Sequence, residues 1–460
     1  MSLIKSISGI RGTIGGKVND NLTPIDAVKF AAAYGMWLKN QTKKEELTVV
    51  LGRDARISGK MVSSLVGNTL VGMGINVTDI GLSTTPTVEV AVQLDKADGG
   101  IIITASHNPK QWNALKLLNN KGEFLNAEDG ENILKIAEND TYIFAEVDDL
   151  GKFRKKKHYI NKHINEVLNL KLVNIEAIKN AKFKVVVDAV NSTGGIAIPA
   201  LLEKLGVECI ELYCEPNGEF PHNPEPLKEH LTDISDLVVK EKADLGIVVD
   251  PDVDRLALVC EDGSMFGEEY TLVTCADYVL SKTAGNTVSN LSSSRALRDI
   301  TQKHGGNYQA SAVGEVNVVE LMKKTNAIIG GEGNGGIIYP ESHYGRDSLV
   351  GVALFLSHLA TLEISCKELR NNYPNYYMSK NKIELTPQIN VDEVLATITS
   401  NYANEDVITI DGVKINFKTE WVHLRKSNTE PIIRIYTEST SQKSADELAK
   451  RFISEIKSII

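Results

Sequence analysis

A single serine stands where a buried strand is expected to end. Ser106 lies in the segment Thr104–Pro109 (TASHNP), directly after the apolar run Ile101–Ile103. In open α/β sheets, ligands bind in the crevice outside the carboxyl ends of the strands, so this position suits chemistry. No Gly-x-Ser-x-Gly elbow surrounds the serine, which argues against a hydrolase nucleophile. Taken alone, the segment favours a simple turn in which Ser106 and His107 are polar loop residues.

Three carboxylates follow a second apolar run. Asp250, Asp252 and Asp254 come directly after Gly246–Val249, two residues apart from one another. If the backbone stays extended, these side chains share one face, and their mutual repulsion makes a cation the natural partner. Oxygen ligands with positions left open for a phosphate oxygen favour Mg²⁺. The segment is interpreted as a magnesium loop, with a solvated acidic turn as the alternative.

Two other acidic motifs fit the same segment less well. A calcium loop would use the three aspartates together with Glu261. That loop requires glycine at its sixth position, where this chain has Arg255, and a turn where Leu256–Val259 is strand-like. The aspartyl phosphatase pattern, Asp-x-Asp-x-Thr, is not continued after Asp254.

A glycine-rich loop, Gly331–Gly336 (GEGNGG), formally matches the dinucleotide-binding fingerprint. That fingerprint must open a helix, whereas the strand-like run Ile337–Pro340 follows here. No Lys-Ser or Lys-Thr follows either, which excludes a P-loop. Glu332 can accept hydrogen bonds from sugar hydroxyls, and Asn334 can donate and accept them. The loop is predicted to bind a sugar, with a turn without a ligand as the alternative.

A donor-rich loop, Arg425–Pro431 (RKSNTEP), precedes the strand-like run Ile432–Tyr436. Its hydrogen-bonding side chains are those of Arg425, Ser427, Asn428 and Thr429. Such a set suits a phosphate group, to which an arginine can bind through two parallel hydrogen bonds. Backbone N–H groups of the loop can add to the anion site. A hydrogen-bonded turn with a surface arginine is the alternative.

The elements that must position these loops alternate along the chain. β-branched runs at 47–51, 101–104, 183–187 and 245–249 are separated by helical patterns, which is typical of βαβ units and mostly parallel sheets. Segments 70–80 and 202–212 resemble each other, each as a helix, a glycine cap and a strand. A fainter copy surrounds Gly305 and Gly306. The sequence therefore predicts stacked, similar α/β domains, followed from Tyr377 onward by a smaller α+β domain.

Shifts in composition suggest the domain boundaries. They fall near the basic run 152–157, after the acidic segment 250–254, and near 371–374, after a long helical pattern at 348–369. The expected domains are 1–150 with the serine loop, 151–255 with the metal loop, 256–370 with the sugar loop and 371–460 with the phosphate loop. The basic run itself is interpreted as a solvated linker or helix start.

Composition narrows the class of protein. At 460 residues the chain is too long for one hydrophobic core. Its net charge of −10 disfavours nucleic acid as the main partner, although a local basic pocket around an anion remains compatible. The five cysteines form no zinc or disulfide pattern. No signal peptide and no apolar run of about 20 residues is present, so we expect a cytoplasmic protein without a membrane partner.

Taken together, the four loops resemble those of the α-D-phosphohexomutase family, in the family's order and along the whole chain. The segments Ser8–Gly12 (SGIRG), Gly52–Arg56 and Asn113–Lys116 match further family segments. The resemblance implies four domains around a central active-site cleft. Three would be similar α/β domains with mixed, mostly parallel sheets, and the fourth would be a smaller C-terminal α+β domain.

The resemblance also implies a reaction. Ser106 would carry a phosphoryl group, and Mg²⁺ would be held by that group and by Asp250, Asp252 and Asp254. Transfer to the free hydroxyl of a hexose phosphate gives a hexose bisphosphate, which acts as intermediate and activator. This bisphosphate reorients in the cleft and returns its other phosphate to Ser106. The net result interconverts hexose 1- and 6-phosphates. The partner is a small phosphosugar, and the protein would be a monomer or a homodimer.

Further roles follow from the same resemblance. Glu332 and Asn334 would hold hydroxyls common to both substrate orientations. The phosphate that is not reacting would be held by Arg425, Ser427, Asn428 and Thr429. Charge on the reacting phosphate would be offset by Arg11, Arg255 and Lys116, with Lys116 or His107 as candidate general acid/base.

Two departures from the family pattern concern the substrate. The common sugar loop has serine where Asn334 stands, and several relatives place a cleft histidine where this chain has Glu315. The Asn334 variant resembles archaeal-type and Bacteroides-type members, several of which are assigned to phosphoglucosamine. We therefore expect a phosphoglucosamine mutase, with a phosphoglucomutase/phosphomannomutase as the alternative. A non-catalytic sugar-phosphate-binding protein would need a broken serine or metal loop, and neither is broken here.

Overall fold

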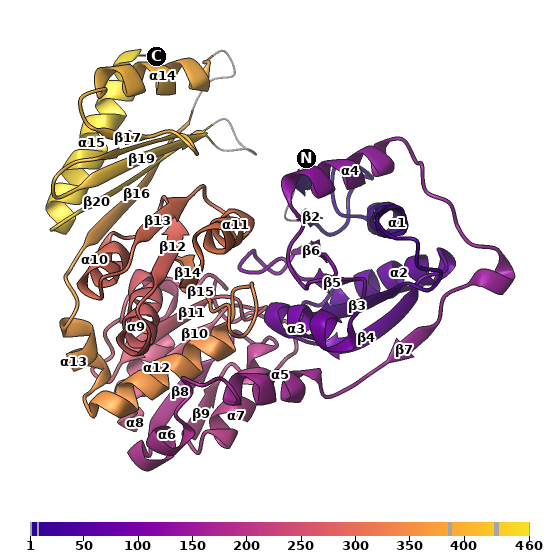
Figure 1. The fold of residues 1–460 in the computed structure, drawn as a ribbon, viewed down its shortest axis with the longest axis horizontal. Coiled ribbons are helices and arrows are strands. Elements are labelled where there is room, and N and C mark those ends of the chain that lie inside the picture. The colour runs from indigo at the N-terminus through magenta and orange to yellow at the C-terminus, as the bar shows by residue number, and fades with distance from the viewer. Residues whose placement is uncertain (1, 7–8, 385–388, 427–431, 460) are drawn as a thin grey trace.

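Four β-sheets follow one another along the chain in this computed structural model, which describes residues 2–6, 9–384, 389–426 and 432–459. The first three sheets mix parallel with antiparallel strands, and the fourth is wholly antiparallel. The predicted fold class is thereby confirmed. In Figure 1 the first domain lies on the right, the second and third form the left-hand body, and the fourth lies above them.

The first sheet has seven strands in the order β1-β2-β6-β5-β3-β4-β7. Strands β5, β3, β4 and β7 run parallel, and β6, β2 and β1 are antiparallel additions at one edge. Its strands are β1 Ile4–Ser6, β2 Gly9–Thr13, β3 Thr48–Arg53, β4 Asn76–Leu82, β5 Gly99–Ile103, β6 Trp112–Leu118 and β7 Phe153–Lys155. Its helices are α1 Pro24–Gln41, α2 Gly59–Gly72, α3 Thr85–Asp95, α4 Ala127–Glu138 and the 3-10 helix η1 Val147–Asp149.

The second sheet has the order β11-β10-β8-β9 and the third the order β13-β12-β14-β15. The second domain contains α5 Tyr159–Leu168, α6 Ile175–Ala181, β8 Lys184–Asp188, α7 Gly194–Lys204, β9 Glu208–Leu212, η2 Lys228–His230, α8 Thr232–Glu241, β10 Leu245–Val249 and β11 Leu256–Cys260. The third contains α9 Glu268–Lys282, β12 Asn286–Asn290, α10 Ala296–Lys303, β13 Tyr308–Ser311, α11 Glu315–Thr325, β14 Ala327–Glu332, β15 Gly336–Ile338, α12 Ser348–Leu362 and α13 Cys366–Asn371.

One strand pattern recurs in all three α/β sheets. A first strand (β3, β8 or β12) lies between two parallel neighbours, and the second of these neighbours pairs with an antiparallel strand. The pattern explains the sequence repeat, since α2–β4, α7–β9 and α10–β13 occupy equivalent places. The same pattern places the predicted serine, metal and sugar loops at equivalent positions in the three sheets. Each joins the last parallel strand to the antiparallel one: β5 to β6, β10 to β11, and β14 to β15.

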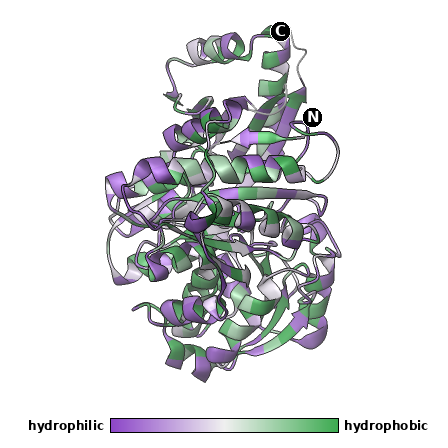
Figure 2. Cartoon of the chain, turned by 90° about the vertical axis from the view of Figure 1, so that its right-hand side faces the viewer, coloured by the Kyte–Doolittle hydropathy of each residue, from purple (hydrophilic) through white to green (hydrophobic). Residues whose placement is uncertain are grey.

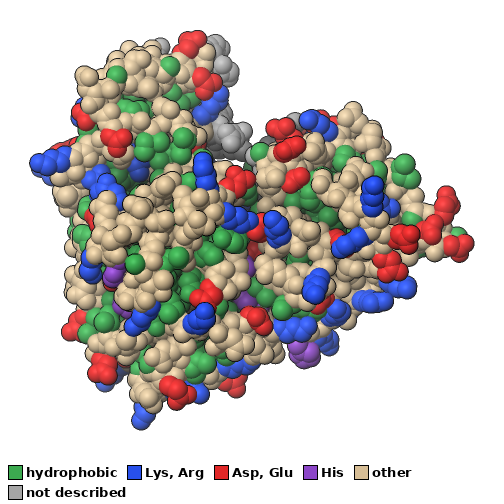
Figure 3. Space-filling view, viewed as in Figure 1, with side chains coloured by type: hydrophobic (Ala, Val, Ile, Leu, Met, Phe, Trp, Pro, Cys, Tyr) green, Lys and Arg blue, Asp and Glu red, His purple; other side chains and the backbone are tan. Residues whose placement is uncertain are grey.

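The fourth domain is an antiparallel sheet in the order β16-β20-β19-β18-β17, packed against two helices. Its elements are β16 Tyr377–Glu384, α14 Val391–Asn401, β17 Asp406–Ile408, β18 Val413–Asn416, β19 Trp421–Lys426, β20 Ile432–Ser439 and α15 Gln442–Ile459. The space-filling view shows a notch between this domain and the first domain (Figure 3).

Strand pairing crosses two of the expected boundaries. Positions 255 and 256 lie within the β10–β11 hairpin, where Val249 pairs with Leu256. Strand β7, which follows position 150, pairs with β4 of the first sheet, with Val77 opposite Phe153. Local composition does not indicate which sheet β7 joins, because its partner β4 lies far away in the sequence. We propose that the first domain extends through β7 and the second through β11.

The long helical pattern at 348–369 is two helices rather than one. Glu363 adopts a left-handed conformation after α12, and Ser365 caps α13 through a capping box with Glu368. The two cap bonds satisfy N–H groups that would otherwise be unpaired at a new helix start. Periodicity alone misses the break because the apolar spacing continues through it.

The largest apolar core is shared by the second and third domains, whereas the first and fourth domains have cores of their own. Helix α12 is buried along nearly its whole length within this shared core. Elsewhere most helices carry both hydrophilic and hydrophobic residues, as Figure 2 shows, and therefore pack on one side only. Among the helices of the described ranges, none is long and apolar enough to cross a membrane.

Candidate active site

Ser106 lies in the β5–β6 loop and faces the aspartate loop of the second domain. Its Oγ donates a hydrogen bond of 2.7 Å to Asp250 Oδ2. The backbone at Ser106 has φ 49°, in the left-handed region that few residues other than glycine adopt. Its amide N–H donates to Thr104 Oγ1 at 3.0 Å, which helps to hold this conformation. The serine is 3% exposed, so its hydroxyl points into the protein rather than into bulk solvent.

A buried arginine, Arg56, braces the serine loop from below. It donates to the backbone carbonyls of Ser106, Asn108, Pro109 and Trp112. Its Nε also pairs with Asp54 Oδ2 at 3.0 Å, so its charge is neutralised inside the protein. The sequence marked Arg56 only as part of a matching segment. Its role was not predictable, because carbonyl acceptors leave no signal in the sequence.

Asp250, Asp252 and Asp254 converge, but not because the backbone is extended. The strand ends at Val249, and residues 250–254 form a turn in which Val253 has φ 65°. Asp250 Oδ1 closes the turn by accepting hydrogen bonds from the N–H groups of Asp254 and Arg255. The condition under which the sequence argument placed the three side chains on one face, an extended backbone, is therefore not met. The carboxylates come within 4.8 Å of one another because the loop folds back on itself.

Lys116, on β6, reaches across from the first domain to this triad. Its Nζ lies 2.7 Å from Asp252 Oδ2 and 3.2 Å from Asp254 Oδ2. Burial alone lowers the pKa of Lys116, but the two carboxylates outweigh burial and raise it. Burial also tends to raise the pKa of Asp252, but the Lys116 ammonium outweighs it and lowers that pKa. Lys116 is therefore a permanent positive charge in the site.

Asp250 lacks such a cation in direct contact. Burial and the charges of Asp254 and Asp252 raise the pKa of Asp250 well above its usual range. Asp252 Oδ1 and Asp254 Oδ1 are buried and have no hydrogen-bond partner in the part of the chain that the structure describes. Unpartnered buried carboxylate oxygens are costly unless a cation binds them. The donor set, all carboxylate oxygen, fits a hard divalent cation.

Arg346, which the sequence analysis missed, binds three carboxylates at once. It donates to Asp254 Oδ2 at 2.7 Å, to Glu332 Oε2 at 2.9 Å and to Glu315 Oε2 at 3.0 Å. Burial alone lowers its pKa, but these carboxylates raise it well above the usual value. Arg346 and Asp254 are 92 residues apart, so no motif connects them. In the sequence Arg346 lies between a strand-like run and a long helical pattern, and nothing there indicates its partners.

The predicted sugar residues lie on the third domain beside this arginine. Glu332 Oε1 accepts hydrogen bonds from Asn290 Nδ2 at 2.8 Å and from the Gly314 N–H at 3.2 Å. Asn334 Oδ1 accepts from the Gly336 N–H at 3.2 Å, which closes the tight turn. Burial raises the pKa of Glu315, whose carboxylate also accepts from the Arg346 N–H.

Three further predicted residues surround the serine loop. His107 Nδ1 lies 3.4 Å from Ser106 Oγ. Burial and the charges of Arg255 and Arg11 lower the pKa of His107 well below its usual value, so the ring is neutral. Arg11 donates to Asn108 Oδ1 at 2.9 Å, and Arg255 pairs with Glu225 at 3.4 Å. These contacts are compatible with one site that contains Ser106 and all three residues. The roles that the sequence analysis assigns to them stay predictions.

The predicted phosphate loop is only partly described. Ser427, Asn428 and Thr429 lie outside the described residues. Arg425, on β19 of the fourth domain, forms an ion pair with Asp411 at 2.8 Å. Within the described ranges, Arg425 forms no ion pair with the other predicted site residues.

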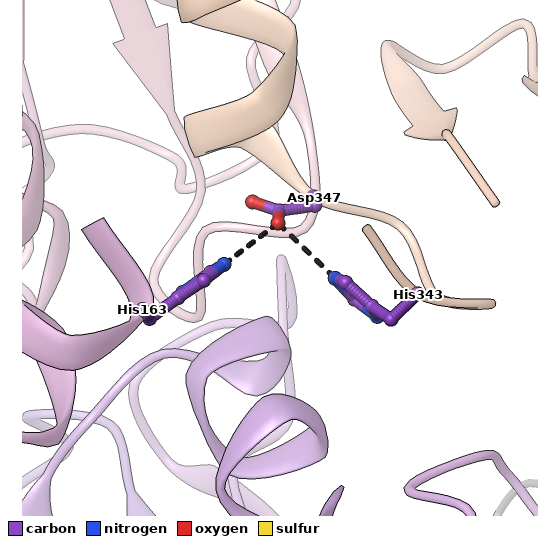
Figure 4. Close-up of side chains that lie close together, drawn as sticks. All are labelled: His163, His343 and Asp347. Carbon is purple, nitrogen blue, oxygen red and sulfur yellow. Dashed lines mark hydrogen bonds and ion pairs between the residues drawn. The ribbon is translucent and has the colours of Figure 1, made fainter. Parts of the chain in front are cut away.

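A buried cluster behind the site joins three domains (Figure 4). The Asp347 carboxylate accepts from His163 Nε2 at 2.8 Å and from His343 Nε2 at 3.1 Å. His343 Nδ1 lies 3.2 Å from Oε2 of Glu89, which stands on α3 of the first domain. These donor atoms could also hold a metal ion, but both Nε2 atoms already bind the same carboxylate oxygen. Asp347 follows Arg346 directly, so the cluster anchors the arginine of the active site.

The cluster must share protons. Both Glu89 oxygens are buried without a hydrogen-bond partner among the described residues, apart from the ion pair with His343. Burial raises the pKa of Glu89 to about 8. Burial alone lowers the pKa of His343, but the hydrogen bond to Asp347 and the ion pair with Glu89 raise it to about 10. The folded protein therefore retains a proton here that the unfolded chain would release.

Four family models match the chain in order. They are the phosphoglucomutase/phosphomannomutase alpha/beta/alpha domains I, II and III, over residues 4–143, 158–263 and 267–377, and the C-terminal domain over residues 382–455.

Individual relatives agree with these models. A phosphoglucomutase/phosphomannomutase of Thermococcus kodakarensis is 34% identical over 440 residues, covering 95% of this chain and 96% of its own. A phosphoglucosamine/phosphogalactosamine mutase of Sulfurisphaera tokodaii is 32% identical, covering 100% and 99%. The crystal structure of a Burkholderia thailandensis family protein superposes with TM-score 0.85 at 25% identity, covering 99% and 98%.

The chain therefore belongs to the phosphoglucomutase/phosphomannomutase, or α-D-phosphohexomutase, family. It is a phosphohexomutase, an isomerase that transfers a phosphoryl group within its substrate.

The buried cluster predicts a specific pH dependence of stability. The folded pKa of His343, about 10, lies above its ordinary value of 6.5. Its stabilising contribution is therefore fully present below pH 6.5 and is lost as pH rises toward 10. The pKa of Glu89 is raised from 4.5 to about 8, so its stabilising contribution is also lost as pH rises between those two values. We expect calorimetry to show a smaller loss of unfolding free energy above pH 6.5 in His343→Gln than in the unmodified protein.

At pH 6 the same variant should be less stable by about 1–3 kcal/mol, because Glu89 loses its buried partner. His158→Gln, at an exposed position, is the matched control and should follow the unmodified protein at every pH. Parallel curves for His343→Gln and the unmodified protein would contradict the proton-sharing account.

Proposed function

We propose that this phosphohexomutase interconverts glucosamine 1-phosphate and glucosamine 6-phosphate, with glucose and mannose phosphates as the alternative. The observation that carries the mutase chemistry is the 2.7 Å hydrogen bond from Ser106 Oγ to a buried aspartate triad with unpartnered oxygens. Support for the amino sugar comes from Glu315 and Asn334 and from the name of the Sulfurisphaera tokodaii relative. Carboxylates near the sugar complement the ammonium group of glucosamine.

Ser106 is the phosphoryl carrier in this mechanism. With Ser106 phosphorylated, a hydroxyl of the bound hexose phosphate attacks phosphorus and the bond from phosphorus to Ser106 Oγ breaks. The proton of the attacking hydroxyl passes by way of His107 to Ser106 Oγ, which leaves as a neutral hydroxyl. The sugar then holds two phosphates. After it has turned over in the cleft, its other phosphate is returned to Ser106 by the reverse step. Braced by Arg56, the serine loop keeps Oγ in one position for both transfers.

Positive side chains around Ser106 offset the charge that builds up during transfer. Arg11, Arg255 and Lys116 take this role, Lys116 with its ammonium fixed between Asp252 and Asp254. Of the two candidates for general acid/base, His107 is better placed. Its Nδ1 lies 3.4 Å from Ser106 Oγ, whereas Lys116 is held by two carboxylates.

The third and fourth domains orient the substrate. Glu332 and Asn334 bind sugar hydroxyls from the β14–β15 loop, with Arg346 holding the Glu332 carboxylate in place. Arg425, Ser427, Asn428 and Thr429 bind the phosphate that is not reacting. Loops on different domains thus grip opposite ends of one phosphosugar, which allows either end to face Ser106.

A magnesium ion fits the aspartate loop. Asp250, Asp252 and Asp254 would hold it together with an oxygen on Ser106. Bound there, Mg²⁺ would neutralise phosphate charge and polarise the transferring group.

Replacement of Ser106 tests the carrier role. Ser106→Ala should lower mutase turnover by at least about a thousandfold, since the residue that forms the covalent intermediate is removed. Intact-mass analysis of the unmodified protein should find one phosphoryl group, which peptide mapping places on Ser106. Ser458→Ala, on an exposed turn of α15, is the control and should keep full turnover. A dispensable Ser106 would overturn the mechanism.

Metal removal tests the aspartate loop. Chelation should abolish turnover and added Mg²⁺ should restore it. In calorimetric titrations with Mg²⁺ alone, Asp254→Asn should bind the ion about 10–100-fold more weakly, because a ligand of the ion is lost. Asp262→Asn, whose side chain is 49% exposed, is the control. Equal Mg²⁺ affinity in the two variants would place the ion elsewhere.

A substrate panel tests the choice of sugar. Turnover of glucosamine, glucose and mannose phosphates is measured side by side with the matching bisphosphate as activator. The highest kcat/KM should belong to the glucosamine phosphates, and Glu315→Gln should lower that value more than the value for glucose phosphates. A preference for glucose or mannose phosphates would leave the mutase mechanism standing and favour the alternative substrate.

A further inference from the structure

A basic cavity on the first domain lies outside the proposed catalytic machinery. It has a volume of about 400 Å³, within the range of small-molecule sites. It opens between the first turns of α2, the carboxyl ends of β3 and β4, and the segment 153–157. Arg53 is the last residue of β3, and open α/β sheets bind ligands at this carboxyl edge of their strands. No residue with a catalytic, metal or sugar role in the proposed mechanism lines it.

The lining carries an excess of positive charge. Its cations are Arg53, Lys60, Lys155, Lys156 and Lys157, and its one carboxylate is Asp79. Lys156 pairs with Asp95 at 2.7 Å. Within the described ranges, the other four cations have no ion-pair partner. This excess does not follow from general basicity, because the whole chain has a net charge of −10.

The α2 helix adds to the positive potential. Helix N-termini carry partial positive charge and are ordinarily stabilised by acidic residues. Helix α2 has no acidic residue in its first turn and no side-chain cap, and Lys60 stands there instead. The Arg53 side chain lies against Gly59, the first residue of the helix, since a Cβ there would meet Arg53 Nη1 at 3.5 Å. Several positive groups therefore converge on one cavity.

Neutral donors complete the cavity. Ser63 is 7% exposed and lines it, and no hydrogen-bond partner for its hydroxyl is found among the described residues. Ser64 and Asn68 line the same face of α2, where the Ser64 hydroxyl donates to the Lys60 carbonyl and the Asn68 amide donates to the Ser64 carbonyl. Phe153 supplies an apolar wall, since its ring packs on α2 at Gly67. A hydroxyl that lines a cavity and has no protein partner is a donor available to a ligand.

We propose that this cavity binds a small molecule with two or more adjacent phosphate groups. Four cations without an ion-pair partner among the described residues and the hydroxyl of Ser63 match the charge and the acceptor oxygens of such a chain. A nucleoside triphosphate and a bare polyphosphate share this chemistry. The Phe153 ring can add stacking to a nucleoside, which distinguishes the two. The segment that the sequence presents as a solvated basic linker thus forms one wall of an anion site.

Calorimetric titration of the full-length protein with ATP and with inorganic tripolyphosphate tests the proposal. Both are titrated without divalent metal at 50 mM and at 200 mM salt. We expect one site per chain and affinity that falls as salt rises. The triple variant Lys60→Gln/Lys155→Gln/Lys157→Gln should bind at least about tenfold more weakly and keep its mutase turnover. If ATP binds more tightly than tripolyphosphate, Phe153→Ala should remove the difference.

Two controls locate the site. Lys171→Gln/Lys240→Gln/Lys324→Gln changes net charge equally at exposed positions elsewhere and should bind like the unmodified protein. Arg425→Gln, in the proposed phosphate loop of the active site, should also leave binding unchanged. The proposal is overturned if neither probe binds at millimolar concentration, if both triple variants weaken binding equally, or if Arg425→Gln abolishes it.

Discussion

Three buried carboxylates at the end of β10 govern the arrangement of this enzyme. Asp250, Asp252 and Asp254 repel one another and have lost most of their hydration, so they require positive charge. The chain supplies that charge from other domains, with Lys116 from the first sheet and Arg346 from the third domain. Because a buried charge without a partner is costly, these ion pairs also fix how the first three domains meet.

Contacts behind the triad extend the same constraint. Thr85, at the start of α3, donates to Asp252 Oδ2 at 2.6 Å. Further along that helix, Glu89 meets His343, whose other nitrogen reaches Asp347 beside Arg346. Charge on the metal loop, the position of α3 and the start of α12 are thus parts of one network. Through it, the serine, metal and sugar loops, which occupy equivalent places in three similar sheets, face a common point.

Much of this could be predicted from the sequence, because it depends on local patterns. Alternating β-branched runs and helical patterns predicted the α/β sheets. As expected, the Thr104–Pro109 segment follows strand β5, and the glycine-rich segment Gly331–Gly336 leads into strand β15. Other features did not follow from local patterns. The place of strand β7 in the first sheet depends on its pairing with β4, and the break after Leu362 depends on the cap at Ser365. The role of Arg346 depends on its contacts with carboxylates on three separate segments of the chain.

By itself, the sequence determined the chemistry that is available: a serine after a buried strand, three close aspartates, a glycine loop with Glu332 and a donor-rich loop at Arg425. Residue type and spacing suffice for this, since both act locally. Only the tertiary structure decided which groups meet. It brought Lys116 to Asp252, 136 residues away. It also placed Arg53, Lys60, Lys155 and Lys157 in one cavity, where none of them has an ion-pair partner among the described residues. Electrostatic energy depends on distance in space, which the order of residues along the chain does not record.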